Sequence, residues 1–139
     1  MLIRFFPLPP FLSFPFPLSL PPFLSTSSSL PVPEGVQAPT VTPTNVENQL
    51  LVAWQPPDQP NGVILLYHVE RALRGSGDFI RLGNVTNSQF LLFADLTTQP
   101  FTEYDYRIVA VNSAGLTAGP ATSILSPEAG KSSSLALIY

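Results

Sequence analysis

The sequence predicts an all-β protein in which two antiparallel sheets pack face to face. In several short runs every second residue is apolar, and residues 34–128 show no sustained 3.6-residue helical period. Turn residues, mainly Pro, Gly and Asn, separate these runs at the regular spacing that is typical of a two-sheet sandwich. A tryptophan in an early run and a tyrosine at the start of a late run complete the pattern.

The first two strands are predicted in the stretches that precede the proline-rich turn at residues 56–62. The stretch "VQAPTVTP" supplies the opening strand, and "QLLVAW" places Leu50, Val52 and Trp54 on one face of the next. The stretch "PPDQPNG" then ends this strand, because two prolines cannot continue a central strand and Asn61-Gly62 accepts positive φ in a tight turn.

The middle strands follow from "VILLYHVERAL" and "FIRL". In the first of these, Tyr67 and Val69 are predicted to face inward, which would turn His68 and Glu70 toward solvent. The stretch "RGSGD" reads as a flexible turn before the short strand around "FIRL".

The last strands come from "FLLFADL", "YDYRIVAV" and "TAGPATSIL", and the final one is an edge strand interrupted by a proline. This makes seven strands in all. The predicted core is formed by their inward-facing apolar and aromatic side chains: Trp54, Tyr67, Val69, Leu96, Tyr104, Tyr106 and Ile108.

The stretch "PFTEYDYRIVAVNSAG" explains how the chain can cross between the sheets. A tyrosine near the start of the sixth strand can bury its ring while its hydroxyl bonds backbone a few residues upstream, an arrangement called the tyrosine corner. Pro100 stiffens the approach and Thr102 can form a local hydrogen bond, so Tyr104 is predicted to determine the fold.

Composition divides the chain into three parts: residues 1–32, 33–128 and 129–139. The first part is almost wholly Phe, Pro, Leu and Ser, and its prolines prevent a membrane-spanning helix. We expect it to be disordered. Its origin could be translated intron sequence, a poor signal peptide or a functional proline-rich segment. Residues 129–139 are expected to be a disordered tail, and intron translation would explain most of it as well.

Composition also excludes several functions. The formal net charge is −3, with no basic surface for nucleic acid, and the chain has no cysteine and one histidine. The sequence contains no Gly-x-Ser-x-Gly elbow and no glycine-rich phosphate loop. We therefore expect no enzyme activity, no cofactor, no metal and no small-molecule substrate.

Three short motifs could still carry a function. Asn84-Val85-Thr86 is an N-glycosylation sequon that we place in a surface turn, although sequons also arise by chance. Arg74 and Asp78 flank Gly-Ser-Gly and do not form a contiguous adhesion motif, and "NSAGLTAG" reads as a plain hairpin turn.

The stretches "LLVAWQPPDQPNGVILLYHVER" and "PFTEYDYRIVAVNSAG" resemble a fibronectin type III module, with Trp54, Tyr67, Leu96 and Tyr104 in register. The resemblance covers residues 33–128 and implies a seven-stranded immunoglobulin-like sandwich. One departure is "LTTQP", which is longer than the usual Leu-x-Pro before the corner.

The same stretches look most like the repeats of a very large ectodomain protein of sensory cells. That likeness implies a structural and interaction module on an extracellular or membrane-anchored adhesion chain. It also implies neighbouring repeats of the same family and matrix partners such as collagen or fibronectin. The alternative is a module of an intracellular muscle-type scaffold, and glycan occupancy at Asn84 would separate the two. A cytokine-receptor ectodomain would need paired cysteines, which the chain lacks.

Overall fold

The computed structural model describes residue 4 and residues 30–86 and 89–128. The predictions of disorder for residues 1–32 and 129–139 therefore lie almost wholly outside the described residues. The secondary structure of the described part consists of eight β-strands, with no helix. It follows that none of these residues forms a helix long and apolar enough to cross a membrane.

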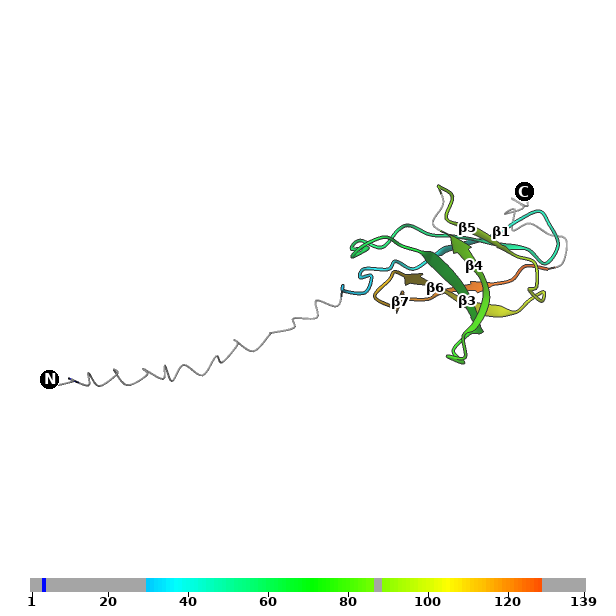
Figure 1. Cartoon of the computed structure of the whole chain (residues 1–139). Coiled ribbons are helices and arrows are strands. Elements are labelled where there is room, and N and C mark those ends of the chain that lie inside the picture. Colours follow the sequence, from blue (N-terminus) through cyan, green and yellow to red (C-terminus); the bar gives the residue numbers. More distant parts are fainter. Residues whose placement is uncertain (1–3, 5–29, 87–88, 129–139) are drawn as a thin grey trace.

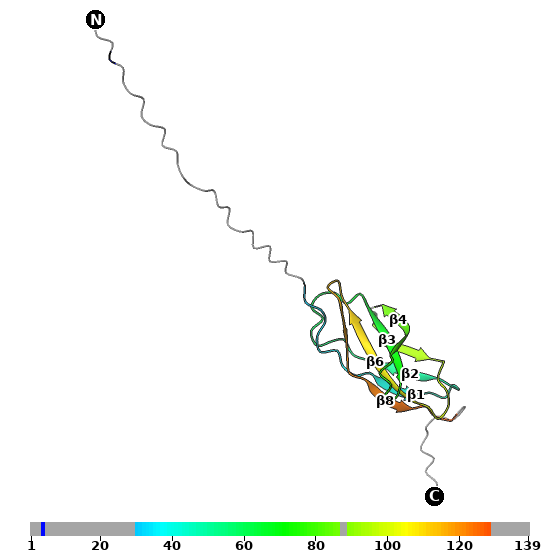
Figure 2. The same ribbon diagram turned by 90° about the horizontal axis from the view of Figure 1, so that it is seen from below.

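The strands form two antiparallel sheets that face each other (Figure 1). The smaller sheet has the order β1-β2-β5, where β1 spans Thr40–Pro43, β2 Leu50–Ala53 and β5 Leu92–Asp95. The larger sheet has β4 (Ile80–Thr86) at one edge, then β3 (Leu66–Leu73) and β6 (Glu103–Val111). Its other edge is formed by β7 (Leu116–Ala118) and β8 (Thr122–Leu125), which both pair with β6. Figure 1 labels β7 beside β6, and Figure 2 labels β8. The predicted all-β sandwich is confirmed.

The final strand accounts for the difference between seven predicted strands and eight observed ones. Pro120 has no backbone N–H to donate, so it separates β7 from β8 within one continuous run along β6. Gly119 keeps the run attached, since its N–H donates to the Ile108 carbonyl at 2.8 Å. The predicted proline-interrupted edge strand is thus present as two short strands.

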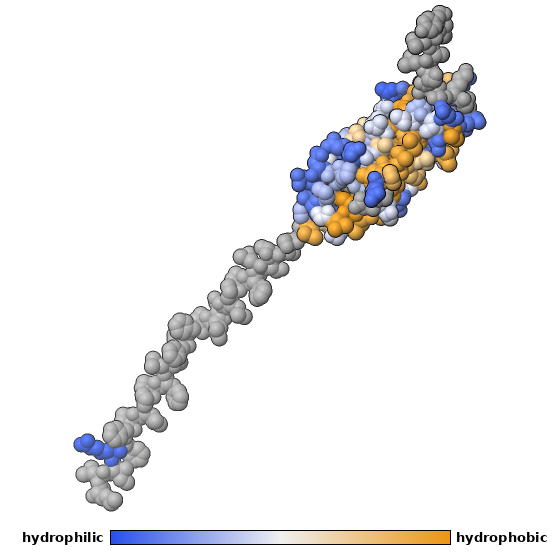
Figure 3. Space-filling view, turned by 90° about the horizontal axis from the view of Figure 1, so that it is seen from above, coloured by the Kyte–Doolittle hydropathy of each residue, from blue (hydrophilic) through white to orange (hydrophobic). Residues whose placement is uncertain are grey.

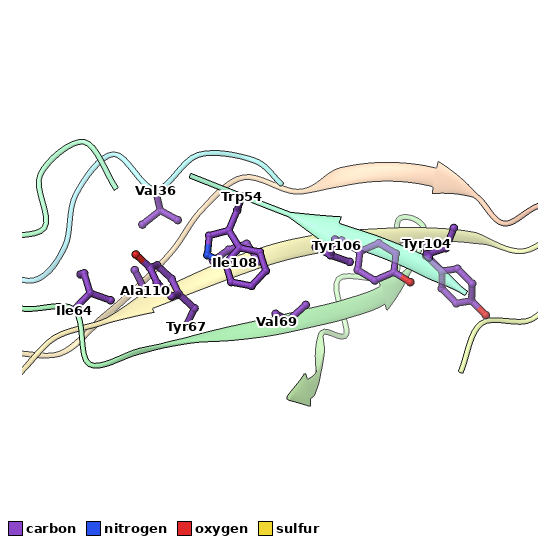
Figure 4. Close-up of a cluster of buried hydrophobic side chains, with 11 residues drawn as sticks. Val36, Trp54, Ile64, Tyr67, Val69, Tyr104, Tyr106, Ile108 and Ala110 are labelled. Carbon is purple, nitrogen blue, oxygen red and sulfur yellow. The ribbon is translucent and has the colours of Figure 1, made fainter. Parts of the chain in front are cut away.

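The core lies between the sheets and follows the alternation of the strands (Figure 4). Leu50 and Val52 of β2 and Val69 of β3 are fully buried. The Trp54 ring meets the Tyr67 ring edge to face, with centroids 5.6 Å apart. Burying an indole stabilises the fold by up to about 4–6 kcal/mol. Six of the seven predicted core residues are buried, namely Trp54, Tyr67, Val69, Tyr104, Tyr106 and Ile108.

The prediction that Leu96 belongs to the core is wrong, because its side chain is 61% exposed. In β5 and the residues around it, Leu91, Phe93 and Asp95 point inward, so alternation turns Leu96 outward. A carboxylate takes the inward position next to it, where hydrogen bonds make its burial possible.

Candidate functional site

The corner before β6 has the predicted tyrosine arrangement. The Tyr104 hydroxyl accepts a hydrogen bond from the Gln99 N–H at 3.0 Å, five residues upstream. The Thr102 hydroxyl donates to the Pro100 carbonyl at 3.1 Å. The end of β8 is held to the same corner, since the Ser126 N–H donates to the Thr102 carbonyl at 2.9 Å. This network fixes the end of the module at which the chain leaves the sandwich.

Behind the corner, a buried ionic cluster joins the two sheets. Asp95 of β5 is only 2% exposed, and its Oδ2 lies 2.6 Å from Arg71 Nη1 of β3. The Tyr106 hydroxyl of β6 donates to the same oxygen at 2.7 Å. The backbone N–H and the hydroxyl of Thr97 donate to Oδ1 at 2.9 and 2.7 Å. Both carboxylate oxygens are therefore satisfied, as a buried charge requires.

The cluster shifts the pKa of each of its members. Burial by itself would raise the pKa of the Asp95 carboxyl, but hydrogen bonds from Tyr106 and Thr97 and the Arg71 charge together lower it. Burial and the neighbouring carboxylate raise the pKa of Tyr106. For Arg71, burial favours loss of the proton, but Asp95 and Tyr106 together outweigh it and the pKa of the guanidinium is raised. All three shifts favour a fixed, ionised Arg71–Asp95 pair and a neutral tyrosine, which is a structural arrangement.

The sequon lies on strand β4 rather than in a turn, which corrects the predicted location. Asn84 is exposed and faces outward opposite His68 of β3. His68 Nδ1 and Asn84 Oδ1 are 2.7 Å apart. An N-linked glycan is attached to Nδ2, so this hydrogen bond leaves the reactive atom of the amide free. Because β4 is an edge strand, a glycan here would also cover a sheet edge.

The prediction that His68 is a solvated surface residue is wrong, since its side chain is only 7% exposed. It does face outward, but it lies on a central strand, paired with Asn84 of β4 on one side and Val109 of β6 on the other, and its ring is hydrogen-bonded to Asn84. Glu70, also predicted to face solvent, is partly buried and pairs with Arg107 at 2.8 Å across β3 and β6.

The loop at residues 74–78 is held against the first residues of β6. Arg74 pairs with Glu103, and the Gly75 N–H donates to Asp105 Oδ2 at 3.0 Å. Gly75 and Gly77 have φ values of 72° and 75°, which a residue with a side chain adopts only with strain. Arg74 and Asp78 are both exposed, but Gly-Ser-Gly separates them in the chain. The geometry gives them no shared binding site.

The outer face of the smaller sheet and the grooves of the surface are the remaining candidate contact regions. The outer face of the smaller sheet carries Thr40, Thr42, Leu51, Ala53, Leu92 and Ala94, without a charged side chain. Figure 3 shows the apolar band on this side of the module. Two open grooves have volumes of about 460 Å³ each. One borders the smaller sheet beside Trp54 and Phe90, and the other lies at the larger sheet beside Leu73 and Ile80. Within the described ranges, no group of side chains could hold a metal ion. Exposed apolar patches of this kind often mark protein-binding surfaces.

Sequence reasoning missed Asp95 and Arg71 as partners, and it missed the pairing of His68 with Asn84. For Asp95 a signal was available, because it lies two residues after Phe93 on the same strand and therefore points to the same, inward face. No sequence signal indicates that Arg71 of β3 and Asp95 of β5 lie together, because they belong to different sheets.

Comparisons with known proteins agree with this geometry. A family model described as "Fibronectin type III domain" matches residues 32–125. Human usherin is 34% identical over 97 residues, which is 66% of this chain and 2% of usherin. The chain therefore spans only a small part of that relative's length. This match confirms the narrower likeness to the large sensory-cell protein.

Solved structures show the same fold. A fibronectin type III domain of the human fibronectin type III domain containing protein 3 superposes with a TM-score of 0.60 at 21% identity. This match covers 78% of this chain and 98% of that domain. Domains A168–A170 of titin give a TM-score of 0.61 at 20% identity, over 70% of this chain and 33% of the titin chain. At these identities the likeness shows the fold alone.

Proposed function

Because the chain belongs to the fibronectin type III family, we propose that it is one non-enzymatic module of a tandem extracellular array. In this role it would act as a spacer and as a protein-binding surface, on a secreted or membrane-anchored chain like usherin. The 34% identity to human usherin over 97 residues is the observation that carries the proposal. The exposed sequon on the edge strand supports it, because N-glycans are added to proteins of the secretory route.

The sequon gives a direct test of this function. The full chain, expressed behind a cleavable secretory leader in cultured animal cells, should migrate faster after removal of N-glycans. Thr86→Val leaves Asn84 in place but destroys the sequon, so this variant should show no shift. Thr86→Ser keeps the sequon and should shift as the parent chain does. A parent chain that is secreted and shows no shift would contradict the glycosylated extracellular module.

The proposed partners are neighbouring fibronectin type III repeats and matrix proteins such as collagen or fibronectin. The apolar outer face of the smaller sheet supports contact with protein. Binding of the purified chain to immobilised collagen and fibronectin, with albumin as a control surface, tests the matrix partners. Equal binding to all three surfaces would argue against them.

The second candidate is a module of an intracellular muscle-type scaffold, which the fold shared with titin supports. An intracellular module would carry no glycan on Asn84, whereas the extracellular module is expected to carry one. Glycan occupancy of Asn84 on the protein as its own cells make it, without an added leader, therefore decides between the two candidates.

A further inference from the structure

Asn112, in the turn after β6, holds together three segments that are distant in the sequence. Asn112 is buried, with only 4% of its surface exposed. The Nδ2 group donates to the carbonyls of Pro31, Pro60 and Asn61, at 3.0, 3.2 and 3.1 Å. The Oδ1 atom accepts from the N–H groups of Ala114 and Gly115, at 2.9 and 3.0 Å. One amide thus caps the turn with its oxygen and anchors the incoming chain with its nitrogen.

The incoming chain is fastened along its length as well as at this point. Asn61 Nδ2 donates to the Val32 carbonyl at 2.8 Å. Glu34 and Gln59 exchange two backbone hydrogen bonds of 2.8 and 3.0 Å. Pro33 and Val36 are buried. Residues 31–36 therefore belong to the rigid body of the module and are not a free linker.

Two glycines make room for this segment. A Cβ on Gly115 would lie 2.9 Å from Val32 Cγ1, and a Cβ on Gly119 would lie 2.8 Å from Val36 Cγ1. Figures 1 and 2 both show the segment beside the turn between β6 and β7, at one end of the sandwich. The end of the module at which the chain enters is thus shaped around the incoming backbone.

We propose that Asn112 is a positioning residue that fixes the direction in which the chain enters the module. The chain then enters the module at a set point and in a set direction along residues 31–36. In an array, this joint would limit the tilt of a preceding module, and exposed Val63 and Leu116 lie at the same end to contact it. The role in an array rests on the proposed function, whereas the fixed entry does not.

The absence of cysteine makes the entry direction measurable. Nitroxide labels on Leu30→Cys and Thr40→Cys in the full chain report the distance between the entry point and β1 by double electron–electron resonance. With Asn112 present, we expect one narrow distance peak. Asn112→Asp keeps the oxygen that caps the turn but loses the donor to Pro31, so the peak should broaden.

Two further variants complete the experiment. Asn45→Ala, an exposed asparagine in the turn between β1 and β2, is the matched control and should leave the peak narrow. Asn61→Gly removes the donor to Val32 and accepts the φ of 51° at that position, so it should broaden the peak even if Asn112→Asp fails to fold.

A broad peak in the parent chain would overturn the proposal. So would narrow peaks in the folded Asn112→Asp and Asn61→Gly variants. The label distances do not depend on glycosylation, and the glycan shift does not depend on the entry segment. Failure of the joint and failure of the proposed function are therefore separate results.

Discussion

Replacing Asp95 with alanine tests the ionic cluster that the sequence did not reveal. The substitution leaves the Arg71 guanidinium, with a side chain only 12% exposed, without its carboxylate. It also removes the acceptor of the buried Tyr106 hydroxyl. Arg71 keeps a hydrogen bond to Thr97 at 3.1 Å and its place over the Tyr104 ring at 4.5 Å. These contacts compensate only in part for the lost charge.

The expected loss is about 3–5 kcal/mol of unfolding free energy, the cost of removing one partner from a buried ion pair. A domain of this size has about 5–15 kcal/mol in total, so Asp95→Ala should be marginally folded. Urea unfolding followed by the fluorescence of Trp54, the only tryptophan, measures the change as a lower midpoint with an unchanged slope.

Asp78→Ala is the control, because it removes an exposed carboxylate on the neighbouring loop. Its effect should be within about 0.5 kcal/mol. If Asp95→Ala lost less than about 1 kcal/mol, the cluster would not join the sheets as described.

The other predictions concern the acid stability of the cluster, the tyrosine corner, the aromatic core and the packing at Gly83. Because the pKa of Asp95 is lowered in the folded state, its contribution is present above about pH 4 and lost as the pH falls further, so Asp95→Asn should show a flatter acid unfolding curve. Tyr104→Phe leaves the Gln99 N–H without its acceptor, so it should lower the unfolding free energy measured in urea by about 1–3 kcal/mol. Tyr104→Ala or Trp54→Ala removes a buried ring and should abolish the cooperative thermal transition. Gly83→Ala should lower the melting temperature, since a Cβ there would lie 2.7 Å from the Phe93 ring, and an unchanged melting temperature would contradict this packing.

The sequence predicted most of the sandwich because its signals are local. Alternation placed Trp54, Tyr67 and Ile108 inward, and the spacing of Thr102 and Tyr104 predicted the corner. These features depend on neighbours within one strand or turn, so period and turn chemistry are enough to predict them.

The remaining features depend on contacts between strands or sheets. The run "FLLFADL" and the register of the module pattern predict Leu96 in the core. Asp95 holds the inward position instead, because partners from the other sheet satisfy its charge. The burial of His68 depends on the width of the larger sheet, in which β4 and β6 flank β3. The role of Asn112 depends on a carbonyl 81 positions away in the chain. Alternation along a single strand carries none of this information.

The packing of Trp54 against Tyr67, which come from opposite sheets, can be measured most directly by proton NMR of the full chain. The two rings lie 5.6 Å apart between their centroids, so nuclear Overhauser cross-peaks should join the indole protons of Trp54 to the ring protons of Tyr67. A folded chain without those cross-peaks would contradict the sandwich, and with it the module from which the proposed function was inferred.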